Sequence, residues 1–96
     1  MVAIIENWSK IEGVVNDIVN HPKMEGYIQV KVHLQKSRLV KGFPNLAQQD
    51  EQSEVYITMP EHLATAIKKG GTFKKVVRKV FGQEYFMKLP KLMKKE

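Results

Sequence analysis

The chain has 96 residues, of which 43% are hydrophobic and 27% charged, and these values predict one folded domain rather than a disordered segment. Sixteen lysines and arginines against ten acids give a net charge of +6, which favours a polyanionic partner: nucleic acid, an anionic membrane surface or an acidic protein. The absence of cysteine excludes disulfides, thiolate catalysis and cysteine-bound zinc, and it suits a reducing, cytoplasmic compartment.

Residues 11–19 are the first expected strand. Apolar residues also recur here at helical spacing, but Gly13 interrupts the segment, and β-branched residues such as Val14 and Val15 disfavour a helix. We therefore expect a strand in which Gly13 permits a bend or a bulge. The strand should end before Pro22, and residues 23–26 should turn into the next strand to make a hairpin.

Residues 27–34 are the clearest expected strand, because apolar and polar side chains alternate along them with a period of two. The buried set consists of Ile28, Val30, Val32 and Leu34. The exposed set combines an aromatic ring, an amide, a cation and an imidazole, which suits a flat anionic ligand as well as a plain solvated surface. Its members are Tyr27, Gln29, Lys31 and His33.

Residues 35–53 are expected to be a polar connection, which at this length is functional or disordered. Its second half is acidic and rich in amides, whereas its first half carries Lys36, Arg38, Lys41 and Phe43. Residues 54–59 alternate again and predict a third strand, with Tyr56 and Thr58 on its exposed side.

A helix is expected directly after this strand, over about residues 61–69. Pro60 suits the first turn of a helix, and Glu61 complements the positive N-terminal end of the helix dipole. Apolar residues in the middle of the segment provide a buried side, and the pair Gly70–Gly71 would end the helix.

Residues 72–81 fit either a helix or a strand. A helix would make residues 60–81 a helix-turn-helix DNA-binding unit. The valines and aromatic residues favour a strand instead, and residues 84–88 have the pattern of a returning partner strand. We expect the strand, so that one domain covers residues 1–88 and residues 89–96 form a basic tail with little affinity for membranes.

The expected elements are three strands, a helix and two strands, at residues 11–19, 27–34, 54–59, 61–69, 72–81 and 84–88. At this chain length the order resembles the OB-fold, a small five-stranded Greek-key barrel with one α-helix between the third and fourth strands. The resemblance covers nearly the whole chain and lies in the pattern of elements, without an invariant motif. It implies a mainly β protein.

The resemblance also implies a function. Members of this family that bind single-stranded nucleic acid use the exposed face of the second and third strands and the adjacent loops, where bases stack on rings and cations follow phosphates. Carried over to this chain, it implies non-enzymatic binding of single-stranded nucleic acid, DNA rather than RNA. The implied site residues are Tyr27, Gln29, Lys31, His33 and Tyr56 on the strands, Lys36, Arg38, Lys41 and Phe43 in the loop, and Lys74, Lys75 and Arg78 on the fourth strand.

Other functions are weighed against this one. The chain has no Gly-rich phosphate loop and no nucleophile motif, and its three histidines are widely spaced, so we expect no enzyme, metal, cofactor or small-molecule substrate. No apolar run reaches the roughly 18 residues of a membrane span, and a secretory signal is absent, so no membrane association is expected. The alternative is a protein-interaction module, including a homo-oligomer, in which the same barrel presents a strand edge or a loop to another chain. The acidic half of residues 35–53 and the apolar residues of the tail would serve such an interaction.

Overall fold

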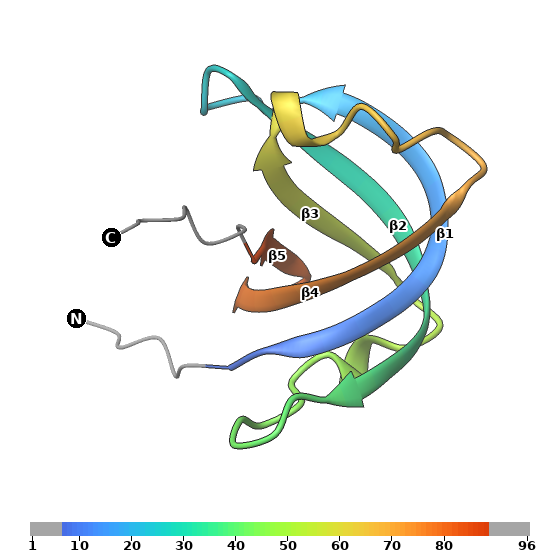
Figure 1. Ribbon diagram of the computed structural model, residues 1–96, viewed down its shortest axis with the longest axis vertical. Helices are drawn as coiled ribbons and strands as arrows, with labels where there is room; N and C mark the ends of the chain where they lie inside the picture. Colours follow the sequence, from blue (N-terminus) through green and yellow to red (C-terminus); the bar gives the residue numbers. More distant parts are fainter. Residues whose placement is uncertain (1–6, 89–96) are drawn as a thin grey trace, which may run out of the picture.

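Five strands close into a barrel in the computed structural model, which describes residues 7–88 (Figure 1). The expected mainly β, five-stranded architecture is therefore confirmed. The expected basic tail, residues 89–96, lies outside the described residues. The strands are β1 (Ser9–Asn20), β2 (Tyr27–Leu39), β3 (Glu54–Pro60), β4 (Thr72–Phe81) and β5 (Glu84–Met87).

The strands follow the order β1-β2-β3-β5-β4 around the barrel, and β4 returns to β1. Neighbouring strands are antiparallel except for β3 and β5, which run parallel. This arrangement is compatible with an OB-like fold. Because β4 pairs with both β1 and β5, residues 72–81 are a strand, and the helix-turn-helix alternative is wrong.

The barrel interior is filled by the apolar side chains that the alternation predicts. Val30, Val32 and Leu34 of β2 are fully buried, and they face the equally buried apolar residues of β3. Burial of one such side chain contributes about 1.5–3 kcal/mol relative to leaving it in water. The largest buried side chains, Phe73 and Tyr85, come from β4 and β5 and complete the core.

A bulge in β2 decides which of its side chains face outward. Gln35 is an extra residue in this strand, because Glu12 pairs with Lys36 whereas the next residue of β1, Gly13, pairs with Leu34. An extra residue shifts the alternation by one position. Before Gln35 the odd-numbered side chains of β2 face outward, and after it the even-numbered ones do. Part of the expected loop is therefore the end of a strand.

Gly13 lies at a close approach between β1 and β2. A Cβ atom at this position would overlap the carbonyl oxygen of His33 and would lie 2.7 Å from Cγ1 of Val32. Glycine in a strand commonly marks a tight bend or the close approach of another backbone. The expected special role of Gly13 is thus explained by crowding from β2.

The α-helix expected over residues 61–69 is wrong. Within residues 7–88 the helical elements are two 3-10 turns, Gln48–Asp50 and Glu61–Leu63, and the rest of the connection between β3 and β4 is irregular. Nine residues make little more than two helical turns, and isolated helices below about 12 residues are marginal. A helix of this length would therefore need stabilising tertiary contacts. In this fold the tertiary contacts of the segment stabilise an irregular conformation instead.

The connection between β3 and β4 is held at both ends by backbone hydrogen bonds. The amide of Glu61 donates to the carbonyl oxygen of Gly26 at 3.0 Å, and the amide of Gly70 donates to that of Val15 at 2.7 Å. The connection covers one end of the barrel, and the longer connection between β2 and β3 lies at the other end (Figure 1). The partly buried apolar side chains of the β3–β4 connection pack on the core without a helix. They are Leu63, Ala64 and Ile67.

Candidate functional site

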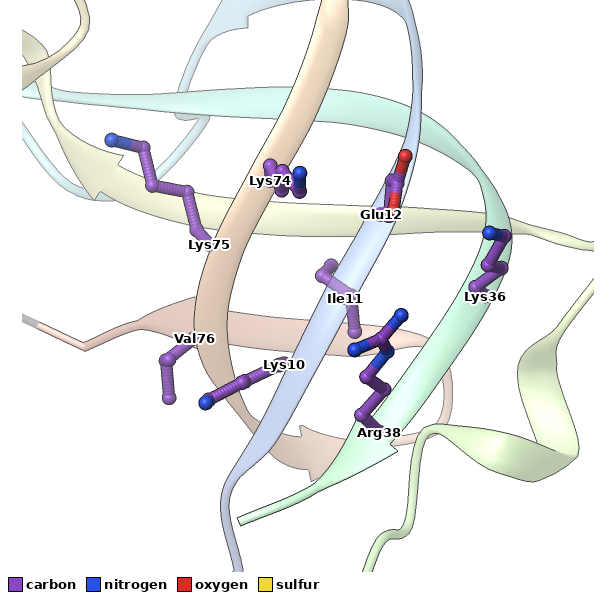
Figure 2. Close-up of a pocket in the computed structure, with 8 residues that line it drawn as sticks. All are labelled: Lys10, Ile11, Glu12, Lys36, Arg38, Lys74, Lys75 and Val76. Carbon is purple, nitrogen blue, oxygen red and sulfur yellow. The ribbon is translucent and has the colours of Figure 1, made fainter.

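A pocket of about 250 Å³ lies on the outer wall of the barrel, where β1 runs between β2 and β4 (Figure 2). Five of its eight lining residues are lysine or arginine and one is acidic, and all five cationic side chains are exposed. Ile11, Glu12 and Val76 complete the lining. We call the five cations the basic wall: Lys10, Lys36, Arg38, Lys74 and Lys75.

Strand register brings four cations of the basic wall together from three separate parts of the sequence. The fifth, Lys75, pairs with the buried Ile11 and lines the pocket from the position after Lys74. Lys10 of β1 pairs with Arg38 of β2. Glu12, on the same side of β1, pairs with Lys36 of β2 and with Lys74 of β4. Directly paired residues of neighbouring strands have Cβ atoms about 5 Å apart, so these side chains form one continuous surface.

The positive charge of this surface is not cancelled by ion pairing. Among residues 7–88 a single salt bridge is present, and it joins Lys79 to Asp50 rather than Glu12 to a pocket cation. Cations gathered on one surface repel one another and create a positive potential that attracts anions. The basic wall is therefore suited to a polyanion.

Arg78, also predicted as a site residue, lies beside Trp8 and not among the pocket residues. Its guanidinium carbon is 6.0 Å from the centre of the Trp8 ring, and the ammonium of Lys88 is 5.5 Å from the same centre. Cations at such distances are attracted to an aromatic face. The amide of Lys88 donates to the carbonyl oxygen of Val76, which lines the pocket, so this cluster adjoins the basic wall.

The outer side of β2 and β3 carries the other predicted strand residues. We call this surface the tyrosine wall: Tyr27, Gln29, Lys31, His33 and Tyr56. Lys31 pairs directly with Tyr56, and Tyr27 pairs with Pro60, four residues further along β3. At about 3.3 Å per residue, the two tyrosines are separated by about 13 Å along the strands. They share one wall of the barrel, although they are not adjacent.

The tyrosine wall is surrounded by carboxylates. Asp17 pairs with Lys31, and Glu84 pairs with Tyr56. Glu54 pairs with His33, so three acids accompany the lysine of this wall. This surface is less favourable to a phosphate chain than the basic wall is, because carboxylates repel phosphates.

The side chain of Glu54 also fixes the chemistry of Tyr56. A hydrogen bond between the Glu54 carboxylate and the Tyr56 hydroxyl, together with the negative charge of Glu54, raises the pKa of Tyr56 above its ordinary value. Glu54 additionally accepts a hydrogen bond from Nδ2 of Asn16 at 3.1 Å, across β2. The tyrosine hydroxyl is therefore held by a carboxylate, and the ring face is the part that a ligand would contact.

The remaining predicted residues, Lys41 and Phe43, lie in the turn after β2 and are not part of the pocket. The loop that follows them is held by side-chain hydrogen bonds: Asn45 accepts one from the Ser9 hydroxyl at 2.7 Å and donates one to Ser37 Oγ at 3.1 Å. This network ties the connection to β1 and β2. Within the stretch expected to be functional or disordered, this network therefore has a structural role, whereas Lys36 and Arg38 of the same stretch line the pocket.

A buried polar network lies between this connection and the barrel. Asp50 accepts a hydrogen bond from the Tyr85 hydroxyl at 2.6 Å and one from the Lys79 ammonium at 3.0 Å. The sequence gives no sign of this network, because an acid in an amide-rich connection is usually exposed. The network joins Asp50 of the connection to Lys79 of β4 and Tyr85 of β5, so we expect it to stabilise the fold.

Alkaline pH should weaken the fold through Tyr85. Burial, followed by the hydrogen bond to Asp50 and its negative charge, raises the pKa of Tyr85 above the ordinary value of 10.0. Above this value the unfolded chain loses the phenolic proton while the folded chain keeps it, so stability falls as the pH rises, by up to about 1.4 kcal/mol per pH unit. Urea unfolding between about pH 9 and pH 11 measures this slope, and Tyr85→Phe should reduce it. An equal slope in the variant would contradict the assignment.

Within residues 7–88 there is no group of three or more His, Cys, Asp or Glu side chains that could hold a metal ion. The same residues form no helix with the length and apolar character needed to cross a membrane. No protein-family model, curated protein or solved structure matches this chain. The function of the protein is therefore inferred from its own geometry.

Proposed function

We propose that this protein binds single-stranded nucleic acid on the basic wall and catalyses no reaction. The observation that carries the proposal is the pocket at which five exposed cations meet a single acid. Phosphate neutralisation by lysine and arginine supplies most of the affinity of such proteins, because bound phosphates release their counterions. The OB-like barrel supports the proposal, since binders of single strands are common among proteins of that architecture.

The spacing of the cations suits a chain of phosphates. Side chains on one face of a strand recur about every 7 Å, and neighbouring strands are about 5 Å apart. Several phosphates of one strand can therefore contact Lys10, Lys36 and Arg38 at the same time. A single strand is favoured over a duplex, because an OB-like barrel wall of this kind is used by many proteins that bind single strands, and residues 7–88 have no α-helix of the helix-turn-helix kind.

The test is a titration of a fluorescein-labelled thymidine oligonucleotide, followed by fluorescence anisotropy. If about five phosphates are neutralised, the affinity should fall roughly 100-fold between about 50 and 200 mM salt. Replacing Lys36 and Arg38 with glutamine removes two contacts and should lower the slope of log affinity against log salt by about 1.4.

The matched control removes the same charge elsewhere. Lys23 and Lys69 are exposed and lie outside the pocket lining, so replacing both with glutamine should leave the slope unchanged. Absence of binding at low salt, or equal effects of the two double variants, would contradict the proposal.

A further inference from the structure

We infer that the bases of the bound strand stack on Phe81 and Phe86, at the edge of the basic wall. This inference rests on the proposed function and adds to it the place where bases, rather than phosphates, are held. We call the two phenylalanines the ring ledge. Large apolar side chains exposed on the described surface are few, and two of the three are in this ledge: Phe81 at 79% and Phe86 at 39%.

Strand register places the ring ledge next to the cations. Phe86 of β5 pairs directly with Arg78 of β4, and Phe81 at the end of β4 pairs with Glu84. Arg78 is on the same side of β4 as Val76, which lines the pocket. A strand that leaves the pocket along β4 therefore reaches Arg78 first and the ring ledge next.

Arg78 connects the two parts of this surface. Its guanidinium lies over Trp8 on the β1 side, and its partner on the β5 side is Phe86. The Nε atom is buried, and no acceptor within residues 7–88 forms a hydrogen bond with it. Rings that alternate with cations are the arrangement in which single-stranded nucleic acid is bound, with bases on the rings and phosphates at the cations.

An exposed phenylalanine is by itself ordinary, because much of any protein surface is apolar. The ring ledge differs because Phe86 pairs directly with Arg78, and Phe81 lies three residues after Arg78 along β4, beside a surface rich in cations. The tyrosine wall also offers rings, but three carboxylates surround it, and only one of these, Glu84, also pairs with a residue of the ring ledge, Phe81. A phosphate chain that brings bases to rings is therefore attracted more strongly to the ring ledge, where Arg78 pairs with Phe86, than to the tyrosine wall.

The experiment compares a thymidine oligonucleotide with an abasic oligonucleotide of the same length, which presents the same phosphates without bases. The double variant Phe81→Leu/Phe86→Leu keeps apolar side chains, and its unfolding transition checks that it folds. It should weaken binding of the thymidine strand roughly tenfold or more and leave binding of the abasic strand unchanged. Tyr56→Leu is the matched control and should change neither affinity.

The outcomes separate this inference from the proposed function. The ring ledge is not a stacking site if Tyr56→Leu weakens thymidine binding and the ring-ledge variant does not. The same conclusion follows if the wild-type protein binds both oligonucleotides equally. In both cases the proposed binding of nucleic acid still stands. If neither oligonucleotide binds at low salt, the proposed function fails and the inference fails with it.

Discussion

Replacing Asp50 with alanine is expected to lower the free energy of unfolding by about 3–5 kcal/mol. The Asp50 carboxylate accepts hydrogen bonds from Lys79 and Tyr85, and the side chains of the Asp50–Lys79 ion pair are only 11% and 14% exposed. Alanine leaves a largely buried ammonium and a buried hydroxyl without an acceptor, which costs more than the pair contributes. Urea unfolding followed by the fluorescence of the single tryptophan, Trp8, measures the loss.

A second variant distinguishes the cost of leaving the Lys79 ammonium unpaired from the cost of removing the Asp50 carboxylate. Asp50→Ala/Lys79→Met removes the unpaired charge and should recover part of the stability, because a buried methionine does not need a charged or hydrogen-bonding partner. The exposed Glu25→Ala should change the free energy of unfolding by less than about 0.5 kcal/mol. If Asp50→Ala destabilises the protein no more than Glu25→Ala does, the network does not stabilise the barrel.

Gly13→Ala is expected to lower the free energy of unfolding by about 3 kcal/mol, at the upper end of the usual cost of overpacking. The added methyl group would meet the backbone oxygen of His33, which has no rotamer by which to move away. This change is opposite in sign to the usual one, since replacing glycine with alanine within a strand usually raises the free energy of unfolding by about 0.5–1 kcal/mol. Urea unfolding of Gly13→Ala measures the change.

Gly42→Ala serves as the control for this prediction. Gly42 has a φ of +91° and no atom within 4 Å of an added Cβ, so its substitution costs only the backbone strain of about 1–2 kcal/mol. A loss for Gly13→Ala no greater than that for Gly42→Ala would show that β1 and β2 can separate without penalty.

The strands of this protein could be predicted because their burial pattern is local. Residues 27–34 alternate strictly, and three of the inward side chains, those of Ile28, Val30 and Val32, pair with apolar residues of β3. Residues 72–81 carry a helical stripe as well, and their valines and aromatic residues gave the correct choice. A helix at this place would leave the backbone groups of β1 and β5 that face β4 without their partners.

The helix expected over residues 61–69 shows where local signals fail. Pro60 and the glycine pair after the segment are the signals of a helix in many proteins. The segment must also reach from the end of β3 to β4, and its hydrogen bonds to Gly26 and Val15 hold it in an irregular path. Those partners are distant in the sequence, so its pattern does not contain this information.

The candidate site could be predicted only in part. Lys36 and Arg38 fall in a predicted loop, and only the bulge at Gln35 places them on the outer wall of the sheet. The lysines of β4 join them because β1 pairs with both β2 and β4, which depends on closure of the barrel. Lys10 precedes the expected strand at residues 11–19, and extending the alternation by one residue would have included it.

Closure of the barrel also limits how a partner can bind. Each strand in residues 7–88 pairs with two neighbours, and only some stretches, such as residues 17–20 of β1, are paired on one side alone. Proteins that recruit partners by strand addition need an open sheet edge, which is also the feature that permits edge-to-edge aggregation. Strand addition to the described barrel is therefore confined to such short stretches, and side chains and loop tips provide the rest of its binding surface.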